Sequence, residues 1–76
     1  MTEATQTLDA RGLNCPLPIL RTRKALNQLD SGAILEVIAT DPGSVKDMES
    51  FCQQTGNRLV SSSEADNSFF FMIEKA

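Results

Sequence analysis

Cysteine is the strongest nucleophile among the side chains of this sequence, and Cys15 stands in an unusual setting, directly before Pro16 and close to Pro18. The first turn of a helix tolerates proline, because the N–H groups there have no acceptor within the helix. A residue that precedes proline is disfavoured in the helical conformation. We therefore expect Pro16 and Pro18 to form a rigid mount that holds Cys15 at or next to the N-cap of a helix.

The surroundings of Cys15 are predicted to favour its thiolate form. A helix N-terminus stabilises a negative charge, although by itself it lowers the pKa of an exposed thiol only slightly. Nearby cations would either stabilise the thiolate further or bind an anionic partner. Four of the seven basic residues lie close to Cys15 in sequence: Arg11, Arg21, Arg23 and Lys24. We interpret Cys15 as an exposed, reactive thiol.

Several kinds of cysteine chemistry are disfavoured by composition and spacing. The 76 residues include no histidine, which excludes a Cys-His pair, a histidine base and a histidine zinc ligand. A thioredoxin-like dithiol needs a second cysteine where Pro18 stands, and Cys52 shares a helical spacing with Met48 that is typical of a core residue. Two uses of Cys15 remain open: an oxidant sensor, and a sulfur carrier that accepts a sulfur atom as a persulfide and passes it to another protein. No cofactor or metal is expected.

The helix after Cys15 is predicted to present a docking surface for a partner protein. Leu17 and Leu20 fall on its outward side together with Arg21 and Lys24. The net charge of −3 and the absence of Trp and Tyr argue against an RNA-binding module or any direct contact with nucleic acid. The sequence contains neither a signal-peptide pattern nor an apolar run of membrane-spanning length, so we expect a cytoplasmic protein without membrane contact.

Hydrophobic spacing and turn residues predict the elements that would position these groups. Asp41 is expected to be the N-cap of a second helix, with Pro42 in its first position and Gly56 at its end. The other predicted elements are a strand at 5–10, a helix at 16–29, a strand at 33–40 and a hairpin of 58–63 with 69–75. Which face of the sheet Phe70 and Met72 occupy depends on strand register and stays open.

This β-α-β-α-β-β order predicts a single domain over residues 1–76. Because each β-α-β crossover is right-handed, both helices should lie on the same side of one sheet. The expected fold is a two-layer α/β sandwich with a four-stranded mixed sheet and two helices packed on one face.

The stretch "LDARGLNCPLPILRTRKAL" resembles the TusA/SirA family of small sulfur-transfer proteins, whose members share an "LD..GL.CP.P" opening. The later stretch "ATDPGSVKDMESFCQQTGNRL" is also similar to that family, although Asn57 stands where many members have histidine. The resemblance implies the two-layer α/β fold and a cytoplasmic carrier in which Cys15 takes up persulfide sulfur.

The resemblance also implies partners. A cysteine desulfurase or a rhodanese-like protein would donate the sulfur, and a downstream relay protein would carry it towards 2-thiouridine in tRNA. Other branches of the family serve sulfur oxidation, thiosulfate use or molybdenum-cofactor assembly, and the residues do not choose among these destinations. The alternative to a sulfur carrier, from a different functional class, is a thiol-based redox-sensing or binding module.

Overall fold

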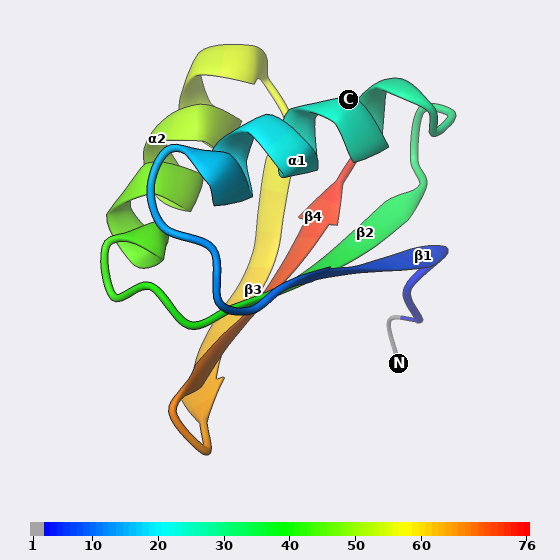
Figure 1. The fold of residues 1–76 in the computed structure, drawn as a ribbon. Helices are drawn as coiled ribbons and strands as arrows, with labels where there is room; N and C mark the ends of the chain where they lie inside the picture. The colour runs from blue at the N-terminus through cyan, green and yellow to red at the C-terminus, as the bar shows by residue number, and fades with distance from the viewer. Residues whose placement is uncertain (1–2) are drawn as a thin grey trace.

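The computed structural model describes residues 3–76, which form four strands and two helices in the predicted order (Figure 1). The elements are β1 (Gln6–Ala10), α1 (Leu17–Asn27), β2 (Ile34–Ala39), α2 (Ser44–Thr55), β3 (Arg58–Ala65) and β4 (Ser68–Glu74). Among the described residues, neither helix is long and apolar enough to cross a bilayer.

The strands form one sheet in the order β1-β2-β4-β3, so β1 and β3 are its two edges. β1 pairs with β2 in parallel, whereas β4 is antiparallel to both of its neighbours, β2 and β3. Both helices cover the same face of this sheet (Figure 1). The predicted fold class, a two-layer sandwich with a mixed four-stranded sheet, is confirmed.

The core lies between the sheet and the helices, and the register of the two central strands decides which side chains enter it. Val37 of β2 pairs with Phe71 of β4, and both are fully buried. Because side chains alternate along a strand, the neighbouring pair of Ile38 and Phe70 lies on the opposite face, and Met72 shares that face. The question about Phe70 and Met72 is thereby answered: both lie, half-buried, on the face without helices.

Helix α1 packs on the sheet through the side away from Leu17 and Leu20, but it begins one residue later than the predicted start at residue 16. Thr22 and Leu26 are fully covered, and the Thr22 hydroxyl donates to the Pro18 carbonyl at 2.7 Å. The Leu17 N–H bonds to the Asn14 carbonyl at 2.9 Å in a separate turn. Pro16 is therefore the N-cap, and Pro18 occupies the second helical position rather than the third.

The predicted start of the second helix was wrong. Helix α2 begins at Ser44 with Gly43 as its N-cap, so Asp41 and Pro42 both precede it. The Asp41 carbonyl accepts the Ser44 N–H at 2.9 Å, which closes a turn ahead of the helix. The predicted end is confirmed: Gly56 follows α2 with a left-handed φ of 77°, a conformation that glycine adopts at little cost.

The C-terminal hairpin is tighter than the sequence predicted. Its strands extend to Ala65 and resume at Ser68, which leaves Asp66 and Asn67 alone in the turn. Both have positive φ, 52° and 63°, as a two-residue type I′ turn requires. Asn and Asp tolerate this conformation better than other residues with a side chain do. The turn therefore needs only these two residues, and the rest of the polar segment 64–68 belongs to the strands.

Candidate functional site

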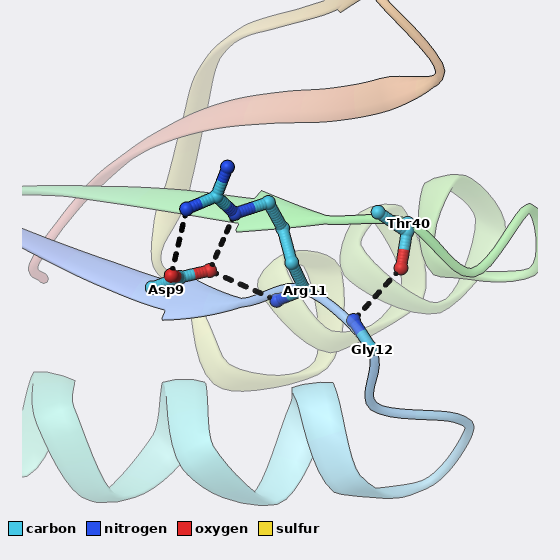
Figure 2. A network of polar contacts seen from close by, with 4 residues as sticks. All are labelled: Asp9, Arg11, Gly12 and Thr40. Carbon is cyan, nitrogen blue, oxygen red and sulfur yellow. Dashed lines mark hydrogen bonds and ion pairs between the residues drawn. The ribbon is translucent and has the colours of Figure 1, made fainter.

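The loop that carries Cys15 is fixed at its start, where it leaves β1. The Gly12 N–H donates to Thr40 Oγ1 at 2.9 Å, which ties the loop to the end of β2 (Figure 2). Just before it, the Arg11 guanidinium pairs with the Asp9 carboxylate at 2.9 Å, on the side of β1 away from α1 (Figure 2). That pairing lowers the pKa of Asp9 to about 2, so its stabilising contribution is present at neutral pH and is lost only as the pH falls towards 2.

A second anchor holds the loop at Cys15 itself. The Asp41 carboxylate accepts the backbone N–H of Cys15 at 2.9 Å through one oxygen and the N–H of Gly43 at 3.1 Å through the other. One side chain thus joins the segment before α1 to the turn before α2. Asp41 was predicted to be the N-cap of the second helix, but its carboxylate binds the Cys15 loop instead. This contact holds the backbone directly before Pro16 and Pro18 in place.

The Cys15 side chain is exposed and opens onto a shallow groove of about 240 Å³ between α1 and α2. The walls combine apolar, cationic and acidic groups, and they come from both helices. They are Cys15, Pro16, Ile19, Arg23, Asp47, Ser50, Phe51 and Gln54. A thiol in this position can be reached by a reactive group of another protein while its backbone stays fixed.

The charges that shift the pKa of the Cys15 thiol are negative, which contradicts the expectation from the sequence. A hydrogen bond to the Asp47 carboxylate raises the pKa of Cys15, and desolvation and the negative charges of Asp47 and Asp41 add to the increase. The sequence pointed to cations and a helix N-terminus as the dominant influences. Asp47 was not among the predicted site residues because it reaches Cys15 only through the packing of α2 beside α1.

The basic residues that were expected around Cys15 are divided among three places. Arg11 is paired with Asp9, as described above. Arg23 lines the Cys15 groove, with its guanidinium carbon 5.7 Å from the centroid of the Phe51 ring. Arg21 and Lys24 line a separate groove beside β1. Only Arg23 of the four shares the groove with the thiol.

The remaining predicted docking residues lie where the helical spacing placed them. Leu17 and Leu20 are 44% and 52% exposed, the only large apolar side chains of residues 3–76 that are this open. Both stand on the surface of α1 near its N-terminal end, close in sequence to the Cys15 mount.

Cys52 has the surroundings of a core residue, as predicted. It is 3% exposed on α2, and burial raises the pKa of its thiol. Both cysteines are free, so no disulfide holds Cys15 away from a reaction partner.

Replacing Asp47 by asparagine should make Cys15 more reactive at neutral pH. The variant removes the negative charge that stabilises the protonated thiol, so the pKa of Cys15 should fall and its alkylation by iodoacetamide at pH 7 should become severalfold faster. The measurement is the alkylation rate from pH 6 to pH 10, followed by intact mass, with the pH midpoint as the readout.

Glu49→Gln is the matched control, because it removes one negative charge from an exposed position of the same helix outside the groove. Its midpoint should stay close to that of the parent chain. Equal midpoints in the Asp47→Asn variant and the parent would show that Asp47 does not control the thiol.

Comparison with known proteins agrees with this geometry. Residues 6–75 match the family described as "Sulfurtransferase TusA". The chain is 58% identical over 76 residues to a sulfur carrier protein TusA of Allochromatium vinosum, with both sequences covered completely. It is 50% identical over 70 residues to a putative sulfur carrier protein of Neisseria meningitidis, which covers 92% of this chain and 95% of that protein.

A solved structure supports the same relationship. The crystal structure of a SirA-like protein from Desulfitobacterium hafniense superposes with a TM-score of 0.83 at 26% sequence identity, covering 92% of this chain and 96% of that one. The match to the family extends over nearly the whole chain and includes the Cys-Pro-x-Pro segment that opens α1. The chain therefore belongs to the TusA family of sulfur carrier proteins.

Proposed function

We propose that Cys15 is the sulfur-bearing residue of this carrier. The observation that supports the proposal most directly is an exposed, free thiol whose backbone is anchored by Asp41 and whose side chain opens onto a groove at the surface. Pro16 and Pro18 act as its mount, because they fix the entry into α1 and Pro18 is itself buried. A rigid backbone presents the sulfur to a partner without first having to order a loop.

The proposed step exchanges one sulfur–sulfur bond for another. The Cys15 thiol gives up its proton, and its sulfur attacks the outer sulfur of a persulfide on the donor protein. A new bond forms between the two sulfur atoms, the bond within the donor persulfide breaks, and its electron pair leaves on the donor thiolate. Cys15 now carries the persulfide, and the same exchange in reverse roles passes the outer sulfur to a thiolate of the acceptor. No oxidant or reductant is consumed.

Asp47 keeps the Cys15 thiol less reactive while no partner is bound. Its carboxylate favours the protonated thiol, which is a poor nucleophile, while the carrier is free. A donor that places a cation near Asp47 would cancel that effect and increase the thiolate fraction on docking. A thiol of higher pKa is also the more nucleophilic once it is deprotonated.

The same feature disfavours the alternative of an oxidant sensor. Sensor cysteines react with peroxide as thiolates, and a low pKa is the property that distinguishes them. Cys15 has its pKa shifted in the opposite direction. The proposed sulfur exchange also needs the thiolate, so the carrier accommodates this shift through a docked donor that generates the thiolate.

We infer that the relay begins with a cysteine desulfurase or a rhodanese-like donor and continues through a downstream relay protein towards 2-thiouridine in tRNA, in the cytoplasm. The groove at Cys15 fits a contact with another protein better than one with nucleic acid, because it contains an acidic group beside the reacting atom. The whole chain of 76 residues would act as one carrier domain.

Intact-protein mass spectrometry tests this function. The reduced chain is incubated with a cysteine desulfurase and cysteine, and separately with a rhodanese and thiosulfate. A gain of one sulfur atom, located on Cys15 by peptide analysis, is the expected result. Loading by the rhodanese alone would redirect the proposed destination, and no gain from either donor would overturn the carrier function of Cys15.

Reversing the charge of Arg21 and Lys24 together should weaken docking. These two exposed cations adjoin Leu20 on α1, and Arg21→Glu with Lys24→Glu should slow sulfur transfer from the donor by about tenfold at low salt, because charges at an interface control association rates. The measurement is the initial rate of persulfide formation at subsaturating donor.

Arg58→Glu with Lys75→Glu provides the control for the change in net charge. Arg58 lies on β3, the edge strand opposite β1, and Lys75 follows β4. Transfer to this control should proceed at nearly the parent rate. If both double variants transfer sulfur as fast as the parent chain, Arg21 and Lys24 are not docking residues.

A further inference from the structure

A second groove, larger than the one at Cys15, lies between α1 and the edge strand β1. Its volume is about 470 Å³, and it is lined by Gln6, Leu8, Arg21, Lys24, Ala25 and Gln28. It therefore has an apolar floor and two cationic side chains, and no carboxylate lines it. Arg21 and Lys24 take part in none of the ion pairs formed within residues 3–76.

The strand beside this groove has an unpaired edge. Within residues 3–76, β1 has β2 on one side and no strand on the other. The Thr5 N–H bonds to the Ile34 carbonyl at 2.7 Å, towards β2. The Ile34 carbonyl therefore faces β1, and because Gln6 pairs with Leu35 in the parallel ladder, Gln6 and Leu8 bond to β2. The N–H and C=O groups of Thr7 and Asp9 consequently point away from the sheet.

The side chains of Gln6 and Leu8 face the helix layer. They alternate with Thr7, whose hydroxyl contacts Glu36 on the opposite face, and they share their face with the buried Ala10. β1 thus offers the backbone groups of Thr7 and Asp9 at its edge and the side chains of Gln6 and Leu8 in the groove. A strand added beside them would place every second side chain under α1, next to Arg21 and Lys24.

We propose that the β1 edge and its groove bind an extended, acidic segment of a partner protein, which pairs with β1 as a fifth strand. Backbone hydrogen bonds would supply affinity, as in other cases of strand addition, and the groove would select acidic side chains at alternate positions. The charge argument is local: the chain carries a net charge of −3, yet this groove presents two cations that form no ion pair within residues 3–76.

The placement also suits a carrier. Pro16, Ile19 and Arg23 of the α1 segment border the Cys15 groove, whereas Arg21, Lys24 and Gln28 border this one, so the two grooves lie on opposite flanks of the helix. A segment held at β1 leaves the thiol uncovered. That the partner belongs to the sulfur relay rests on the proposed function, whereas strand pairing at β1 does not.

The test uses the reduced, unloaded protein and no sulfur donor, so that it is independent of Cys15 chemistry. The probe is the peptide acetyl-Thr-Glu-Val-Glu-Val-Glu-Thr-amide, titrated while backbone amide resonances are recorded. We expect saturable shifts confined to β1 and to residues 21–28 at the C-terminal end of α1 and its cap, and an affinity that weakens with salt. The peptide with lysine in place of every glutamate should cause no shifts there.

Two further comparisons separate strand pairing from simple charge attraction. Arg21→Glu with Lys24→Glu should weaken binding about tenfold or more. N-methylation of the three glutamates blocks one edge of the peptide strand, and N-methylation of the two valines with the second threonine blocks the other. One of these two peptides should lose binding and the other should keep it, since only one edge meets β1.

Any other pattern with the methylated peptides contradicts strand pairing. The proposal is also overturned if the glutamate peptide causes no shifts, if its shifts fall around Cys15, or if the lysine peptide binds equally well. Shifts of β1 that depend on protein concentration alone would show that the edge pairs with a second copy of this chain instead. Sulfur loading can succeed or fail in any of these cases, so the two proposals are judged separately.

Discussion

Replacing Cys15 by serine should abolish sulfur loading while leaving the fold intact. A serine hydroxyl cannot form a persulfide, and the side chain of Cys15 is exposed, so no core contact is lost. The anchor to Asp41 uses the backbone N–H and survives the substitution. The measurement is the mass of the variant after incubation with a cysteine desulfurase and cysteine, beside its thermal unfolding midpoint, which should match that of the parent chain.

Cys52→Ala is the matched control, because it removes the other thiol. Cys52 is buried, so we expect a loss of stability of about 1 kcal/mol and unchanged loading at Cys15. Retained loading in the Cys15→Ser variant would move the sulfur-bearing role to Cys52 or to no cysteine at all. Loss of loading in both variants, with both folded, would indicate that the two thiols act together.

Replacing Phe71 by alanine should bring the domain close to unfolding. Phe71 is the largest fully buried side chain and lies on β4, a central strand of the sheet. Truncating a buried phenylalanine costs about 3–5 kcal/mol. A chain of 76 residues has a net stability of roughly 4–11 kcal/mol, so the variant loses a large share of it. Urea unfolding followed by circular dichroism would measure the difference.

Phe70→Ala makes the same chemical change one residue earlier on β4. Its side chain is half-buried on the face without helices, so the expected cost is much smaller than for Phe71. The two variants therefore test the strand register directly. Similar losses at both positions, or a greater loss at Phe70, would mean that the register is wrong.

The fold class could be predicted from the sequence because its signals are local. Each strand and helix has its own hydrophobic spacing, and the glycine and proline positions separate them. The start of α2 was misplaced because Asp41 and Pro42 are typical of a helix start, whereas the Asp41 carboxylate is used by the Cys15 loop. That contact joins residues 26 positions apart, which local patterns do not record.

The features of the site likewise fall into those set by the local sequence and those set by the packing of distant segments. The exposure of Cys15 follows from Pro16 and from the spacing of α1, so it could be predicted. The influence of Asp47 on the thiol pKa depends on how closely α2 packs beside α1, and the allocation of Arg21 and Arg23 to different grooves depends on where α1 lies over the sheet. Sequence neighbours of Cys15 turned out to be a poor guide to its electrostatic neighbours.

The position of β4 in the sheet also bears on how the chain can fold during its synthesis. β4 is the last element in chain order, yet it lies between β2 and β3 and contributes Phe71 and Ile73 to the core. While the ribosome has yet to add these residues, β2 has only β1 beside it and β3 has no neighbour at all. Until β4 has been synthesised, the sheet therefore lacks one of its two central strands, and the core between sheet and helices cannot form.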